Sequence, residues 1–215
     1  MRPSLESAFC SRFPLPLLTA FVGILFLAAA TAPAFPQSNA VTLPRNLSQL
    51  VAESDSVVQG RVTSVSLEPH PKLRNLLMVV VTMQLEETLI GQSTGVYTFS
   101  QAAIDKRDQQ QKMGYHVGQH FLLLMIRPSA FGLTSPAGMQ QGRFEIVRSA
   151  EGKLLAVNGI SNAGLFRDMD SQLKGLRAQV SERTVELFDG QKSGSLPVED
   201  LKTVIRAIAP RKLAQ

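Results

Sequence analysis

The stretch SDSVVQGRVTSVSLEP, residues 54–69, alternates like a β-strand but changes phase halfway along. Val58 and Val62 lie on one face of an extended chain, whereas Val65 lies on the opposite face. A strand with one buried face keeps a single parity of apolar residues. The change of phase therefore predicts either one deformed strand or two separate short strands.

A β-bulge explains the change of phase within a single strand. The bulge inserts one extra residue, which bends the strand and reverses the parity that faces inward. We expect the bend at Gly60 and at the small pair Thr63-Ser64, because small residues tolerate a sharp corner. In a small barrel the first strand bends in this way and serves both halves of the sheet.

The segment 77–89 predicts a second, unusually long strand. Its apolar residues keep one parity, which predicts one face buried throughout: Leu77, Val79, Val81, Met83, Leu85 and Leu89. At ~3.3 Å per residue its 13 residues would span ~43 Å if straight, so we expect the strand to curl.

The rest of the chain supplies the remaining strands and several helices. Apolar runs predict strands at 95–101 and 119–128 and a hairpin of 142–149 with 152–159. The polar segment 102–118 is expected to be helical or irregular. Helical spacing predicts helices within 46–55, 168–188 and 196–210. The sequence therefore predicts a mainly β protein with helical additions, built on a small barrel of about five to six strands.

The first residues have the three parts of a secretory signal peptide. Arg2 and Arg12 precede an apolar run over 15–30, and Ala32 and Ala34 are the small residues before a cleavage site. We expect cleavage after Ala34, with cleavage after residue 40 as the alternative. A retained membrane anchor is disfavoured because the apolar run is shorter than the ~20 residues that a spanning helix needs. The sequence therefore predicts a secreted or periplasmic protein without a retained transmembrane segment.

The predicted domains follow from these assignments. A signal peptide occupies 1–34, the barrel occupies 41–165, and a helical extension occupies 166–215 with a linker near 189–195. Apolar residues make up 44% and charged residues 18% of the chain, which is typical of a globular protein with a core. The formal charge of +5 is spread along the chain and not gathered in runs, which argues against a nucleic-acid partner.

Four segments follow one another in the order of an OB-fold. They are SDSVVQGRVTSV (54–65), VVVTMQLEETLIGQ (79–92), GVYTF (95–99) and GYHVGQHFLLLMI (114–126). Together they resemble the netrin-type module of the tissue inhibitors of metalloproteinases, and of secreted bacterial proteins with a similar pattern. Residues 54–58 stand where that family has alanine-aspartate and two apolar residues. Ile90 stands where its lysine-glycine pair has lysine, and Gly118 leads the later strand.

The resemblance covers about residues 46–160 and implies an OB-like β-barrel. It does not transfer the inhibitory mechanism, because those inhibitors chelate zinc through an N-terminal cysteine. The only cysteine of this chain is Cys10, inside the expected signal peptide. The mature chain is therefore expected to have no disulfide and no cysteine metal ligand.

No catalytic motif emerges from the sequence. His116 and His120 are four residues apart, but a strand would separate them by ~13 Å, so we expect no metal site and no cofactor. Asp105 and Asp108 are expected to be solvated. A weak hydrolase that uses these four residues is kept as an alternative, to be excluded if the structure scatters them.

A ligand groove is the candidate site. OB barrels bind ligands on the face of their second and third strands, often with aromatic residues. The candidates here are Tyr97, Phe99, Tyr115 and His116. The alternative for Phe99, as for Phe121 and Phe144, is burial in the core.

The leading functional hypothesis is a non-catalytic binding module that engages an envelope or extracellular protein. The alternatives are a regulator of a secreted protease that acts without cysteine–zinc chelation, a weak hydrolase, a glycan-binding protein and a structural role in the envelope. The apolar stripe of the last predicted helix, 196–210, is expected to pack on the barrel, with partner binding as the alternative.

Overall fold

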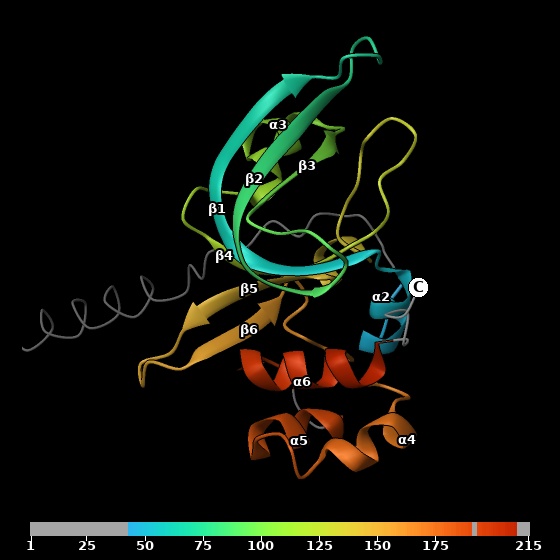
Figure 1. Cartoon of the computed structure of the whole chain (residues 1–215), viewed down its shortest axis with the longest axis vertical. Coiled ribbons are helices and arrows are strands. Elements are labelled where there is room, and N and C mark those ends of the chain that lie inside the picture. The colour runs from blue at the N-terminus through green and yellow to red at the C-terminus, as the bar shows by residue number, and fades with distance from the viewer. Residues whose placement is uncertain (1–42, 191–192, 210–215) are drawn as a thin grey trace, which may run out of the picture. The chain divides into compact units, whose positions relative to one another are not determined.

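The computed structural model describes residues 43–190 and 193–209 (Figure 1). The expected signal peptide and both expected cleavage sites lie outside the described residues. The described residues belong to one compact unit, and the C-terminal helices share its core with the sheet. In this part of the chain, no helix is both long enough and apolar enough to cross a membrane.

A seven-stranded antiparallel sheet organises the described residues, which confirms a mainly β protein with helical additions. The strand order is β3-β2-β1-β4-β5-β6-β7. The strands are β1 (Ser56–Pro69), β2 (Leu77–Ile90), β3 (Val96–Ala103), β4 (His120–Met125), β5 (Arg143–Arg148), β6 (Leu154–Asn158) and β7 (Leu196–Pro197).

The expectation of a closed barrel is wrong, because β3 and β7 are the two edges of an open sheet. The segment after β4 contacts both β3 and β4 but forms no strand of the sheet. It makes only isolated bridges, a parallel one between Ser100 and Leu133 and an antiparallel one between Met125 and Pro136. Its glycine and proline residues favour turns over a ladder, so it contacts β3 without extending the sheet.

The bend of β1 is confirmed, and the alternative of two short strands is wrong. Val62 pairs with Met83 and Ser64 pairs with Thr82, so Thr63 is an extra residue in the ladder. A second irregularity lies between Gln59 and Gly60. Val62 and Val65 consequently pack against the same core although their parity differs. Figure 1 shows β1 and β2 as two long, curved strands side by side, so the curl expected for the long strand is also present.

The expectation that β2 buries one face along its whole length is wrong. Gln59 pairs with Glu87 and Gly60 pairs with Leu85, so Glu86 is an extra residue in β2. Leu85 packs against one core, whereas Leu89 packs against the other. The bulge at Glu86 therefore reverses the buried parity within this strand, as the bulge at Thr63 does within β1.

Two apolar cores lie on the two faces of the sheet. The strand core, formed mainly by β1 to β4, comprises Val58, Val62, Val79, Val81, Met83, Phe99, Ala103, Tyr115, Phe121, Leu123 and Met125. The helix core includes Leu50, Val57, Leu122, Phe144, Leu173, Phe188 and Leu201. Because β4 alternates between the two cores, all six of its residues are buried, as its two-sided apolar sequence predicts.

The helices that pack into the helix core are α2 (Leu47–Glu53), α4 (Asp170–Leu173), α5 (Glu182–Phe188) and α6 (Val198–Ile208), together with the 3-10 turn η3 (Lys174–Leu176). Helix α3 (Lys106–Gln110) contacts β2 and β3 instead, and the 3-10 turn η1 (Lys112–Gly114) packs against the strand core through Met113. A third 3-10 turn, η2 (Met139–Gln141), precedes β5. Asn46 and Gln49 form a capping box at the start of α2, which explains why that helix begins there.

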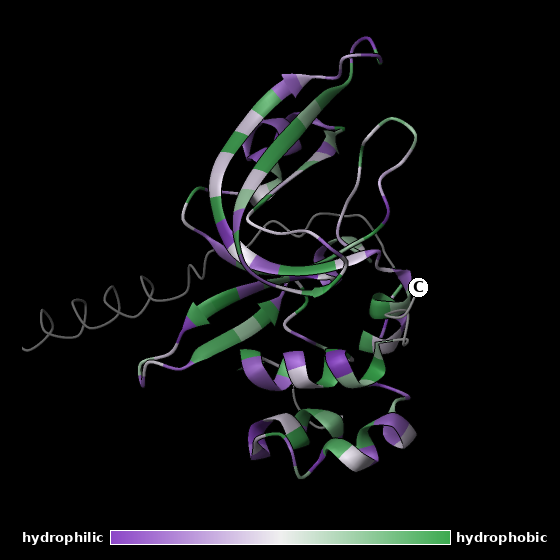
Figure 2. Cartoon of the chain, viewed as in Figure 1, coloured by the Kyte–Doolittle hydropathy of each residue, from purple (hydrophilic) through white to green (hydrophobic). Residues whose placement is uncertain are grey.

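The C-terminal segment differs in part from its prediction. The expected helix over 168–188 is divided into α4, η3 and α5, because Gly175 and the turn before Ser181 interrupt it. The last helix is confirmed as α6, and its apolar stripe packs into the helix core as predicted. Figure 2 shows α6 with separate hydrophobic and hydrophilic stretches, as a helix with one buried face requires.

Candidate functional site

The aromatic residues proposed for a ligand groove are gathered together but lie mostly in the core. The rings of Tyr97 and Phe99 are 5.8 Å apart and those of Phe99 and Tyr115 are 5.6 Å apart. Phe99 is 4% exposed and Tyr115 is 1% exposed. Phe99 and Tyr115 are committed to the strand core, and Tyr97 is half-buried against it, so these rings do not form the open groove that was expected. His116 lies apart from them on an exposed loop, and its backbone N–H donates to Gln119.

Arg143 covers the end of this aromatic cluster. Its guanidinium lies 4.8 Å from the ring centre of Tyr115 and 5.6 Å from that of Phe121. It also donates a 2.8 Å hydrogen bond to the carbonyl of Met113. Burial raises the pKa of the Tyr115 phenol, although the nearby guanidinium acts in the opposite direction. The burial expected as the alternative for Phe99, Phe121 and Phe144 is confirmed.

The four residues of the hydrolase hypothesis are not assembled into a site. Asp105 caps α3, accepting the backbone N–H of Asp108 at 2.7 Å. His116 is exposed on its loop. His120 is buried in β4, where its side chain contacts β1 and β2. No interaction among the described residues joins these four side chains, so the structure gives the hydrolase no support.

His120 instead belongs to a polar cluster that the bulge at Glu86 creates. The carboxylate of Glu86 lies 2.9 Å from His120 Nε2 and accepts a 3.0 Å hydrogen bond from Gln59 Nε2. Its second oxygen pairs with Arg61 at 3.1 Å. Burial lowers the pKa of His120, while the Glu86 carboxylate opposes that effect. The cluster ties β1, β2 and β4 together.

The next residue of the bulge, Glu87, fixes helix α6. Its carboxylate accepts a 2.8 Å hydrogen bond from Lys202 and a second bond from Arg206. Burial acts to raise the pKa of Glu87, but the hydrogen bonds from Lys202 and Arg206 outweigh it and hold the pKa below its ordinary value. The bulge therefore directs two consecutive carboxylates into structural contacts on β4 and α6. Within the described ranges, no group of three or more His, Cys, Asp or Glu side chains could hold a metal ion.

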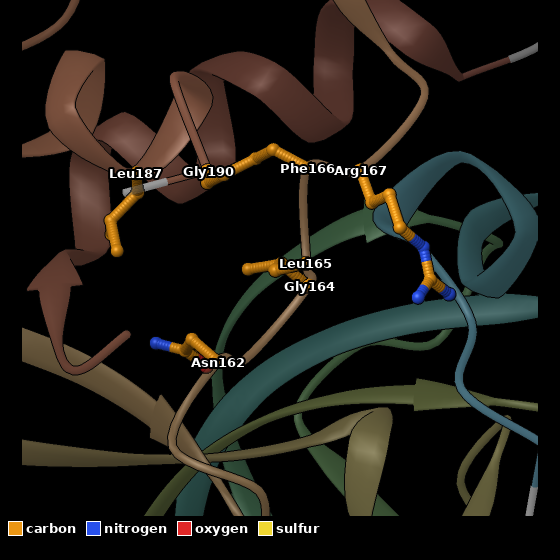
Figure 3. Close-up of a pocket in the computed structure, with 7 residues that line it drawn as sticks. All are labelled: Asn162, Gly164, Leu165, Phe166, Arg167, Leu187 and Gly190. Atoms are coloured by element: carbon orange, nitrogen blue, oxygen red, sulfur yellow. The ribbon is translucent and has the colours of Figure 1, made fainter. Parts of the chain in front are cut away.

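A small hollow lies between the turn after β6 and helix α5. It has a volume of about 160 Å³, and Figure 3 draws the residues around it: Asn162, Gly164, Leu165, Phe166, Arg167, Leu187 and Gly190. Ligand pockets usually enclose ~300–1,000 Å³. The side-chain amide of Asn162 already donates to the carbonyls of Ala156 and Gly194 and accepts from the backbone of Asn158. The hollow is small, and the polar side chain of Asn162 in its wall is already hydrogen-bonded within the protein. These two features are typical of a packing defect and not of a ligand site.

The most distinctive exposed feature is formed by two loops that meet at His70. We call it the tip surface and define it as Lys72, Leu73 and Arg74, between β1 and β2, together with Phe131 after β4. His70 itself is 6% exposed. Its Nδ1 accepts the backbone N–H groups of Lys72 at 3.1 Å and Leu73 at 2.9 Å. Its Nε2 lies 3.0 Å from the carbonyl oxygen of Phe131.

These contacts select one form of the His70 ring. An Nδ1 that accepts two N–H groups carries no proton, so the proton of the neutral ring lies on Nε2 and is donated to Phe131. The ring therefore organises the β1–β2 turn on one side and holds the second loop on the other.

The second loop is held at its base and exposed at its tip. Thr134 donates its backbone N–H to Ser100 of β3 and its hydroxyl to the carbonyl of Ile126. Ser129 and Leu133 close the turn with a 2.8 Å backbone hydrogen bond. Phe131 is nevertheless 53% exposed. The loop therefore presents an aromatic ring to solvent on a fixed backbone.

Sequence reasoning did not find the tip surface. It treated His70 only as one of three histidines, and the loop around Phe131 only as a connection rich in turns. One signal in the sequence could have indicated it: Phe131 lies between Pro128 and Gly132, in a loop that contains no aspartate or glutamate. Comparisons with protein-family models, with curated proteins and with solved structures found no match.

Proposed function

We propose that this chain is an exported, non-catalytic binding module that engages an envelope or extracellular protein through the tip surface. The observation that carries the proposal is the state of Phe131, which is 53% exposed while the buried His70 holds its carbonyl. The predicted signal peptide supports the extracytoplasmic location.

The physical argument rests on the entropy of binding. Association requires loops and side chains at an interface to become ordered, and a loop that is already ordered avoids much of that cost. Aromatic side chains at the centre of an interface commonly contribute a large share of the binding energy. A fixed loop that exposes one aromatic ring combines both properties.

We also propose that the strand half of the chain is related in fold to the OB-like, netrin-type module. The pairing of β1 supports this, since the strand pairs with β2 along its length and with β4 over Ser56–Arg61. The bend of β1 at Thr63, after the part that pairs with β4, supports it as well. The open sheet and the isolated bridges of the loop after β4 distinguish this chain from a closed barrel.

The test compares capture by variants of the complete chain, produced with its own N-terminal segment and a C-terminal tag. The wild type, Phe131→Ser and the matched control Val147→Ser are immobilised and exposed to envelope and culture fractions of the producing cells. Val147 is 40% exposed on β5, away from the tip surface. We expect one protein to be retained near stoichiometrically by the wild type and the control, and about tenfold less or weaker by Phe131→Ser. Equal capture by all three chains, or capture by none, would refute the proposal.

Regulation of a secreted protease is the second candidate. The observation that favours it is the same exposed loop, because a protease-binding segment must also be presented in a fixed conformation. Digestion of casein by proteases of the culture fraction should then be slowed by the wild type and by Val147→Ser, but not by Phe131→Ser. Unchanged digestion with the wild type would exclude this candidate.

A further inference from the structure

We propose that the tip surface docks an acidic segment of its protein partner, with carboxylates that pair with Lys72 and Arg74 beside an apolar side chain packed on Phe131. This inference rests on the proposed function and adds the chemistry of the partner. It requires that the two cations have no internal partner and that they lie beside the exposed ring.

The charges of the two loops are of one sign. Residues 69–77 and 126–137 contain Lys72, Arg74 and Arg127 and no aspartate or glutamate. Arg127 is paired with Asp55 at 3.2 Å. Lys72 and Arg74 are exposed and form no ion pair among the described residues. Two cations of the tip surface are therefore available to an external carboxylate.

The position of these cations contrasts with that of the cations on α6. Lys202 and Arg206 both bond Glu87, which leaves them engaged within the fold. Glu68 is the carboxylate nearest to the β1–β2 turn in sequence, and its side chain is hydrogen-bonded to Ser66 and forms no ion pair with Lys72 or Arg74. The two cations of the tip surface are therefore not engaged by a carboxylate of the described residues.

The ring of His70 joins the backbone of Lys72, two residues before Arg74, to the backbone of Phe131. One imidazole nitrogen accepts the N–H of Lys72, and the other donates to the carbonyl of Phe131. A single ring therefore separates the two backbones. The imidazole of His70 also contacts the Phe131 ring edge to face, with centroids 6.3 Å apart. An acidic segment that crosses this junction reaches the cations and the ring together.

The same composition favours a protein over a lipid surface. Stable membrane binding needs two signals, such as an acyl chain together with a cluster of several basic residues. Two cations and one half-exposed ring supply less than that. Phe131 and Arg74 belong to residue types that are enriched at protein–protein interfaces.

The probe is a fluorescein-labelled synthetic peptide that repeats Glu-Glu-Leu-Leu, and binding is followed by fluorescence anisotropy with the full chain. A peptide that repeats Gln-Gln-Leu-Leu is the neutral control. We expect the acidic peptide to bind at least about tenfold more tightly than the neutral one, with an affinity that falls as salt is raised.

Charge reversal locates the site. The double variant Lys72→Glu and Arg74→Glu should weaken binding of the acidic peptide by about tenfold or more. The matched control is Lys153→Glu with Lys174→Glu, which changes the net charge equally at two exposed lysines outside the tip surface. Equal weakening by the two double variants would overturn the inference, as would equal binding of the two peptides. Circular dichroism verifies that every variant is folded.

The outcomes separate this inference from the proposed function. If the acidic peptide does not bind but a protein is captured in a way that depends on Phe131, the acidic chemistry is overturned and the proposed binding module is retained. Capture that is independent of Phe131 would overturn both. Vesicles of phosphatidylglycerol that bind the chain more tightly than the peptide, and that lose binding with Lys72→Glu and Arg74→Glu, would replace the protein partner by a membrane.

Discussion

A methyl group added at Gly60 would place its carbon 2.3 Å from the carbonyl oxygen of Gln84 and 3.0 Å from the Cα of Leu85. The first distance is about 1 Å shorter than the 3.4 Å at which ordinary contacts begin. Both neighbouring atoms belong to the backbone of β2, so no side chain can rotate away. Gly60 also pairs with Phe121 of β4, and β1 therefore cannot move freely in the other direction.

The expected loss of stability in Gly60→Ala follows from this geometry. Crowding a packed interior costs about 1–3 kcal/mol. Separating β1 from β2 at this point weakens about two ladder hydrogen bonds, at about 1 kcal/mol each. Alanine stabilises by about 0.4–1 kcal/mol through the lower entropy of the unfolded chain. The sum predicts a decrease of about 3 kcal/mol in the free energy of unfolding, which is a large part of the ~5–15 kcal/mol typical of a domain.

The assay is urea unfolding followed by far-UV circular dichroism, because the chain contains no tryptophan. The matched control is Gly175→Ala, where the added carbon meets nothing within 4 Å. We expect the control to match or slightly exceed the wild type in free energy of unfolding, and Gly60→Ala to be less stable than the wild type by about 3 kcal/mol. A Gly60→Ala variant within 0.5 kcal/mol of the wild type would show that the close approach of β1 to β2 does not constrain this residue.

Three further predictions concern the polar contacts that hold the helices and β4. Burial acts to raise the pKa of Glu87, but the hydrogen bonds from Lys202 and Arg206 of α6 outweigh it and lower the pKa from its ordinary 4.5. The ionised Glu87 therefore stabilises the fold fully above pH 4.5, and this stabilisation is lost as the pH falls through the native pKa. Lys202→Met should therefore reduce the fall of the urea midpoint between pH 7 and pH 3. Burial lowers the pKa of His120 from 6.5, so stability should decline as the pH falls below 6.5, and His120→Gln should lose this part of the decline between pH 7 and pH 5. The carboxylate of Asp200 accepts hydrogen bonds from Thr184 and from the residue that precedes α5, so Asp200→Ala should cost about 2 kcal/mol in urea unfolding, and an unchanged midpoint would contradict that role.

The parts of the fold that the sequence predicts are those whose signals are local. The phase change between Val62 and Val65 requires an extra residue, and only the small pair Thr63-Ser64 suits that position. The last helix carries its own apolar stripe and its own N-terminal carboxylates, so it could be recognised without knowledge of its partner. In each case a few neighbouring residues contain the necessary information.

The bulge at Glu86 has no such signal. Leu85 and Leu89 share a parity and predict an unbroken face, but the pairing skips Glu86 because Gly60 allows β1 to approach closely at Leu85. The cause thus lies on a strand more than 20 residues away in the sequence. The closure of the barrel failed as a prediction for a similar reason, since it depends on how the loop after β4 meets Ser100.

The open sheet also explains why the aromatic residues and the proposed binding surface are found in different places. Without a strand that pairs along the outer edge of β3, large side chains must close that side of the strand core, and Phe99 and Tyr115 do so with the cover of Arg143. The rings expected to bind a ligand are thereby committed to stability. Side chains that could contact a partner must then come from segments that lie outside the core. The two loops joined by His70 meet that condition, because their backbones are fixed while Phe131 remains free to contact a partner.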